Sequence, residues 1–75
     1  MKKQDKIEIL TDSIIDKMTE WLIRDFKLDI PSAMNIIYNS STLELLQNKH
    51  TDMYAQSPGY VYFILENEYL TGKMP

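Results

Sequence analysis

The sequence predicts an all-α single domain of about four helices, long, short, short and medium, with the first and last helices forming most of the core. Three observations predict this class. Apolar residues recur at steps of three and four, proline and small polar residues stand where helices would begin, and only one segment has a strand-like composition. A chain of 75 residues has the size of one domain and no linker divides it, so residues 1–75 are expected to fold as a unit.

The first helix is expected from Asp5 to Phe26. Its apolar residues form a stripe about 160° wide, which is typical of a helix packed on a core. The stripe consists of Ile7, Leu10, Ile14, Ile15, Met18, Trp21, Leu22 and Phe26. The outer surface carries an acidic stripe of Glu8, Asp12, Asp16 and Glu20, whose neighbours repel each other weakly. This acidic stripe is either a docking face for a basic partner or a solvated helix surface, and the second alternative is the commoner one.

Two short helices are expected next. Asp29 and Pro31 mark the start of the first, because aspartate is a good N-cap and proline fits the first turn. This helix should reach about Tyr38, and its apolar face should contain Ile30, Met34 and Ile37. After a break at residues 39–41, Ser41 and Glu44 have the spacing of a capping box, which predicts another short helix that frays over residues 47–49. A polar loop is expected over residues 48–52.

The fourth helix carries the most informative pattern in the chain. Ser57 is its expected cap and Pro58 its first residue, and it should end near Leu70 with Gly72 as the stop. Its residues are apolar on almost every side, so it must be surrounded by protein, either its own or a partner's. The alternative is a strand over residues 60–64, because this run has high β propensity. A lone strand has no partner in the chain and would need a dimer to pair.

Charge and composition limit the cellular compartment and the classes of binding partner that we expect for this protein. The net charge is −3, and residues 28–75 hold only two lysines against five acidic residues, so nucleic acid is not an expected partner. No cysteine is present, the apolar run of a signal peptide is missing, and no uncharged segment is long enough to span a bilayer. A cytoplasmic protein without membrane contact is therefore expected.

Residues that could carry chemistry are few. His50, Asp52 and Ser57 are of the three residue types that form a hydrolytic triad, but they lie in an expected surface loop and at a helix cap. Neither a metal-ligand set nor a phosphate-binding loop is present, so no catalytic, cofactor-binding or metal site is expected and the chain is not expected to be an enzyme. The two short helices have the outline of a helix-turn-helix, which leaves a DNA-binding regulator as the alternative function.

The aromatic residues near the fourth helix point to protein contact instead. They are more numerous than a domain of this size encloses easily, and tyrosine suits interfaces because it buries a ring while its hydroxyl finds a partner. We expect a protein–protein interaction module, either a homodimer or the partner of another small protein. The predicted contact residues are Tyr54, Tyr62, Phe63 and Tyr69.

The second half of the chain resembles a family of short uncharacterised bacterial proteins, a domain of unknown function. The resemblance lies in Tyr38-Asn39-Ser40, Leu46, Thr51-Asp52-Met53-Tyr54, Gln56-Ser57, Tyr60-Val61-Tyr62, Leu65 and Glu68. It implies no enzyme activity and no catalytic residues. Because some members look like the small partner of a toxin-like reading frame, the resemblance implies an antitoxin-like or accessory role.

Overall fold

The computed structural model describes residues 3–72, apart from the side chains of residues 3–5 and 49. Its elements are α1 (Lys3–Phe26), α2 (Ile30–Tyr38), α3 (Ser41–Gln47), the 3₁₀ turns η1 (Lys49–Thr51) and η2 (Met53–Ala55), and α4 (Pro58–Thr71). Four α-helices and no strand are present in the described residues, which confirms the all-α prediction. The strand alternative for residues 60–64 is wrong, since these residues lie within α4.

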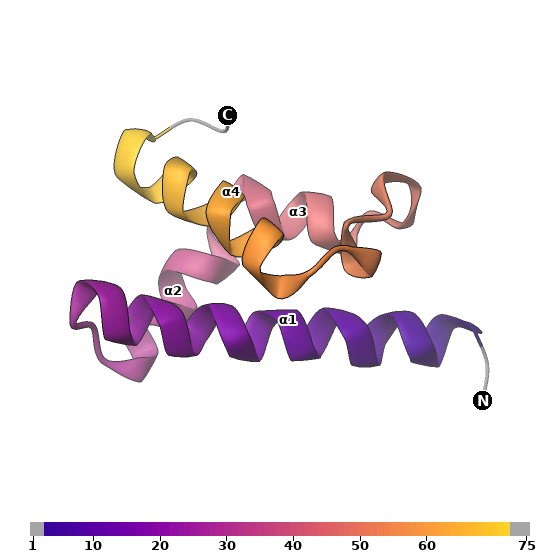
Figure 1. The fold of residues 1–75 in the computed structure, drawn as a ribbon, viewed down its shortest axis with the longest axis horizontal. Helices are drawn as coiled ribbons and strands as arrows, with labels where there is room; N and C mark the ends of the chain where they lie inside the picture. Colours follow the sequence, from indigo (N-terminus) through magenta and orange to yellow (C-terminus); the bar gives the residue numbers. More distant parts are fainter. Residues whose placement is uncertain (1–2, 73–75) are drawn as a thin grey trace.

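The long helix α1 is the base on which the other helices lie (Figure 1). At 1.5 Å per residue its 24 residues span about 36 Å, which accounts for the longest dimension of the molecule, 37 Å. The chain leaves α1 through Lys27, whose φ of 54° is left-handed. Helix α2 then runs back across α1, and α3 and α4 lie above it (Figure 1).

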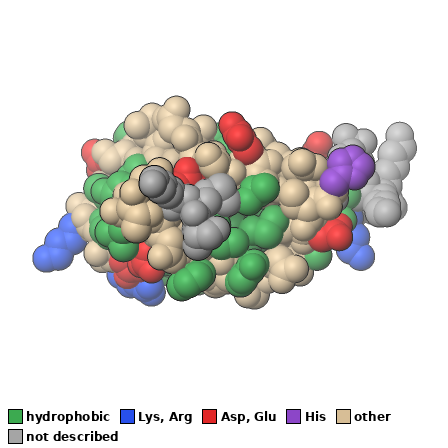
Figure 2. All heavy atoms as spheres, turned by 90° about the horizontal axis from the view of Figure 1, so that it is seen from above, with side chains coloured by type: hydrophobic (Ala, Val, Ile, Leu, Met, Phe, Trp, Pro, Cys, Tyr) green, Lys and Arg blue, Asp and Glu red, His purple; other side chains and the backbone are tan. Residues whose placement is uncertain are grey.

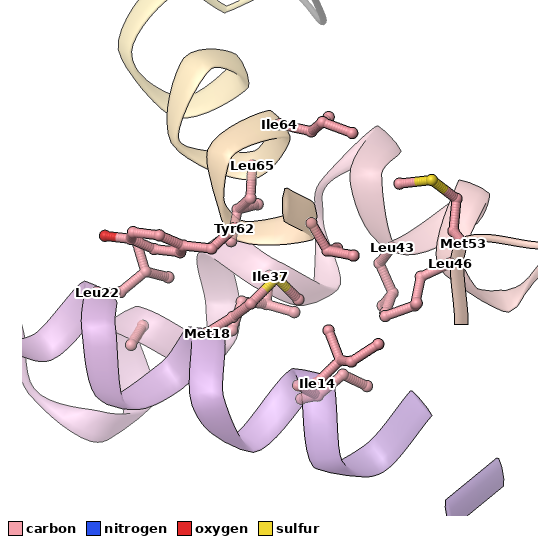
Figure 3. Close-up of a cluster of buried hydrophobic side chains, with 13 residues drawn as sticks. Ile14, Met18, Leu22, Ile37, Leu43, Leu46, Met53, Tyr62, Ile64 and Leu65 are labelled. Atoms are coloured by element: carbon pink, nitrogen blue, oxygen red, sulfur yellow. The ribbon is translucent and has the colours of Figure 1, made fainter. Parts of the chain in front are cut away.

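The core forms where the four helices meet (Figure 3). Four of its thirteen buried hydrophobic residues come from α1 and four from α4, which confirms the prediction that these helices supply most of the core. The thirteen are Ile14, Ile15, Met18, Leu22, Ala33, Ile37, Leu43, Leu46, Met53, Val61, Tyr62, Ile64 and Leu65. Figure 3 shows the α1 side chains pointing up toward Ile37, Leu65 and Tyr62.

Two residues predicted for the apolar face of α2 are outside the core. Ile30 and Met34 are exposed, whereas Ala33 and Ile37 are buried. The two pairs lie on neighbouring sides of the same helix, because residues three and four apart share a side. The prediction is therefore right for Ile37 and wrong for Ile30 and Met34, because the buried side of α2 combines Ile37 with Ala33, whose small side chain allows close helix approach.

Three of the predicted helix caps are confirmed. The Ser32 N–H donates to Asp29 Oδ1 at 2.9 Å, and the Tyr60 N–H donates to Ser57 Oγ at 3.3 Å. Gly72 ends α4 in the left-handed conformation, with φ 76°, and its N–H donates to the Glu68 carbonyl oxygen at 2.7 Å. This conformation is one that glycine adopts without steric cost.

The predicted capping box of α3 is wrong by one residue. The N-cap is Ser40 and not Ser41, since the Leu43 N–H donates to Ser40 Oγ at 3.1 Å. Glu44 then stands one position beyond the place from which a capping box closes. A residue from α4 takes over the remaining N–H groups at this helix start, as described below.

Candidate interaction surface

Helix α4 is apolar on two opposite sides. One side carries Val61, Ile64 and Leu65 and is buried in the core. The other side points away from it and carries Tyr60, Phe63 and Leu70, which are 51%, 57% and 64% exposed. We call these three residues, with Asn67 between them, the outward face of α4. The prediction that this helix is apolar all round therefore describes two surfaces, of which the chain itself covers one.

The outward face is straight because of its spacing. At 100° per residue, the four positions fall within a sector of about 80°, and the steps of three, four and three are those of a helix-pairing seam. Asn67 is half-buried, and its side-chain NH₂ donates to the Phe63 carbonyl oxygen at 2.7 Å. Figure 2 looks onto the side of the molecule that carries α3 and α4. Hydrophobic side chains gather at the centre of this view, and the visible Lys and Arg side chains lie toward its two ends.

Tyr62, one of the predicted contact residues, lies in the core. It is 8% exposed, its ring packs against Trp21 with the centroids 5.2 Å apart, and its hydroxyl donates to Asp25 Oδ2 at 2.7 Å. Burial raises the pKa of the Tyr62 hydroxyl, and the hydrogen bond to Asp25 raises it further. The Arg24 guanidinium, and after it the Tyr62 hydroxyl, lower the pKa of Asp25. We leave Tyr62 out of the candidate surface, because its ring and its hydroxyl both have partners within the chain.

The other predicted contact residues lie in different places. Phe63 is on the outward face of α4. Tyr69 lies at the side of that helix, 41% exposed, with its ring edge-on to Phe26 at a centroid distance of 4.8 Å. Tyr54 is half-buried in η2 and lines a groove against α1 with Leu10. The structure therefore does not bring the four residues onto one surface, and Tyr60 and Leu70 extend the surface that Phe63 belongs to.

Glu68 joins α4 to α3 in a way that the sequence pattern did not reveal. Its carboxylate accepts the N–H of Ser41 at 2.7 Å, the N–H of Thr42 at 2.9 Å and the Thr42 hydroxyl at 2.6 Å. Partial burial raises the pKa of Glu68, but these hydrogen bonds outweigh it and hold the pKa below its usual value. A carboxylate at a helix N-terminus also interacts favourably with the helix dipole. Glu68 therefore fixes the position of α4 over α3.

The residues considered for chemistry are not joined by hydrogen bonds. His50 lies exposed in η1, and within the described part of the chain its imidazole has no hydrogen bond. The Ser57 hydroxyl serves as the cap of α4, and Asp52 is an exposed residue with a left-handed φ of 55°. Among the described residues there is no group of three side chains that could hold a metal ion.

Comparisons with known proteins return no match, whether with protein-family models, with curated proteins or with solved structures. The resemblance to a family of short bacterial proteins thus stays a prediction. In residues 3–72, no helix combines the length and the apolar character that crossing a membrane requires.

Proposed function

We propose that this protein acts without catalysis, as a module that binds another protein chain through the outward face of α4. The observation that carries the proposal is the line of Tyr60, Phe63 and Leu70, each more than half exposed on the side opposite the core. Together they place three large apolar side chains in one exposed stripe, and the largest apolar patch on a monomer is often functional. Two of the three are aromatic, which is typical of residues that dominate interfaces.

The same face sets the chemistry of the contact. It contains no charged side chain, and Asn67 at its centre offers a polar group that can pair with a partner's polar group. A single asparagine in an apolar seam favours one register over others. A second copy of this chain and another small protein both satisfy these requirements. An antitoxin-like or accessory role would use the second kind of contact.

DNA readout through α2 and α3 has less support. The recognition helix of such proteins presents its N-terminal residues to the bases and to the backbone. At the start of α3 the N–H groups of Ser41 and Thr42 donate to the Glu68 carboxylate, which would repel phosphate, and Glu44 is exposed on the same helix. Phosphate anchoring needs Lys and Arg at such positions.

Photo-crosslinking in the cells of origin tests the proposal. A photoreactive phenylalanine analogue placed at Phe63 should give one discrete protein adduct, either twice the chain's mass or a larger hetero-adduct. The matched control is Ile9, which is also apolar, helical and about equally exposed, at 53% against 57%. Position 9 should give no discrete adduct. A discrete adduct at both positions, or at neither, would contradict the proposal.

A charge substitution then measures the contact in purified protein. Phe63→Asp should disrupt the assembly identified by crosslinking while preserving the helical circular dichroism. Ile9→Asp should leave the assembly intact. Each substitution places an aspartate three residues before an acidic side chain, Glu66 or Asp12, and position 9 also follows Asp5 by four residues and Lys6 by three, so both substitutions carry a small helix penalty. Light scattering gives the mass of each species.

A further inference from the structure

The groove between α1 and α2 has one apolar wall and one acidic wall. The α2 wall presents Ile30, Met34 and Tyr38, and the α1 wall presents Asp12, Asp16 and Glu20. In each wall the residues are four apart, so each run follows its helix for about 12 Å. The two runs match in length and differ in chemistry.

The side chains of the apolar wall are not part of the hydrophobic core. Ile30 and Tyr38 are 59% and 54% exposed, and Met34 is exposed beside them. The core contacts of α2 are made by Ala33 and Ile37 instead. Three large apolar side chains in a line beside a groove are what a helix-in-groove contact uses as its anchor sites.

The acidic wall lacks compensating charge. Asp12 and Asp16 form no ion pair with any described side chain, and Glu20 meets only the exposed Lys17, at 3.8 Å. Carboxylates four residues apart on a helix repel each other. Cations brought in by a bound segment would relieve this repulsion, so the wall selects for a basic edge.

We propose that this groove binds an amphipathic helix of a partner protein, with apolar residues along one edge and Lys or Arg along the other. The apolar edge would lie on α2 and the basic edge on α1. Charge complementarity favours this occupant over the outward face of α4 from a second copy, because Pro58–Thr71 contains no Lys or Arg and would bring Glu66 toward the acidic wall. The proposal is independent of the one made for α4.

Two synthetic peptides of about four helical turns serve as probes. Both carry leucines along one face, one with lysines beside the leucines and the other with glutamates in their place. The full chain, labelled with ¹³C at its methionine methyl groups, is titrated with each peptide in solution. The lysine peptide should move the Met34 methyl resonance and leave that of the buried Met53 in place. The glutamate peptide should move neither.

Matched variants distinguish the effect of the groove carboxylates on peptide binding from the effect of the protein's net charge. Asp12→Asn with Asp16→Asn should weaken binding of the lysine peptide roughly fivefold, as expected for two exposed ion pairs. Glu44→Gln with Asp52→Asn removes the same charge elsewhere on the surface and should leave the affinity unchanged. Met34→Lys should abolish binding while the circular dichroism stays helical. Binding by Phe63→Asp should equal that of the unmodified chain, which keeps this test separate from the test of α4.

Four results of the peptide titrations would overturn the proposal. They are failure of the lysine peptide to bind, equal weakening by the two double variants, binding that leaves the Met34 methyl unmoved, and binding retained by Met34→Lys. If the chain self-associates and Met34→Lys makes it monomeric, a second copy occupies the groove and the partner proposed here is wrong.

Discussion

The outward face of α4 and the apolar wall of α2 are both lines of large, exposed hydrophobic side chains, yet they have different neighbours. The α4 line has Asn67 at its centre and no charge within it, whereas the α2 line faces three carboxylates across a groove. Apolar exposure by itself indicates only that a surface can be covered. The charged residues beside an apolar surface indicate which kind of partner chain would cover that surface. The expected partner therefore differs between the α4 line and the α2 line.

The largest expected effect tests whether the two sides of α4 differ as described. Leu65→Ala on the buried side should lower the free energy of unfolding by about 2–5 kcal/mol, through lost burial and a cavity. Leu70→Ala on the outward face should change it by less than ~0.5 kcal/mol. The two leucines are 1% and 64% exposed in one helix, so urea denaturation of both variants at low protein concentration gives a matched comparison. A large loss for Leu70→Ala would mean that the chain already buries this face.

A second prediction concerns the contact that holds α4 in place. Glu68→Gln removes the charge that accepts two backbone N–H groups and the Thr42 hydroxyl, and should cost about 1 kcal/mol, as for loss of a helix cap. Because the folded pKa of Glu68 is lowered, its contribution is complete above the usual glutamate pKa of about 4.3 and is lost as the pH falls through the folded value.

Urea denaturation between pH 3 and 7 measures this effect. The difference between the unmodified chain and Glu68→Gln should shrink toward the acid end of the range. Glu66→Gln is the control, since this neighbouring carboxylate accepts no hydrogen bond from α3. An equal, pH-independent difference for both variants would show that the Glu68 charge plays no part in joining α4 to α3.

The smallest expected effect concerns the repulsion among the carboxylates of the acidic wall on α1. Asp16→Asn removes two like-charge contacts along α1, with Asp12 and with Glu20, and should stabilise the fold by a few tenths of a kcal/mol. The gain should diminish at high salt, because these carboxylates are exposed and their repulsion is screened. Thermal unfolding at low and high salt is the measurement, with Glu44→Gln as a control. A destabilised Asp16→Asn would mean that the wall supports the fold instead of straining it.

Much of the fold follows from local interactions that can be recognised in the amino-acid sequence. The extents of α1 and α4 and the caps at Asp29, Ser57 and Gly72 were predictable, since each depends on neighbours within one turn. The two short helices were predictable as well. The start of α3 was not, because Ser40 and Ser41 are equally good caps. In the structure Ser40 is the cap, and the N–H of Ser41 donates to Glu68, 27 residues further along the chain.

The candidate surfaces were predictable only in part. Phe63 and Tyr62 were both predicted as contact residues from the number of aromatic residues in this segment, and in the structure Phe63 is exposed whereas Tyr62 is buried. The reason is that an apolar helix without a polar face gives no sign of which side meets the core. In the same way, nothing local distinguishes Ile30 and Met34, which are exposed, from Ile37, which is buried.

By itself, the sequence determined the number of helices, their extents to within about two residues and the absence of a polar face on α4, because hydrophobic periodicity and capping act over a few residues. Only the tertiary structure decided which side of each helix is buried, that Glu68 caps α3, and that the acids of α1 stand across a groove from the exposed side chains of α2. These features depend on how the helices cross, and the crossing is set by packing among residues far apart in the chain.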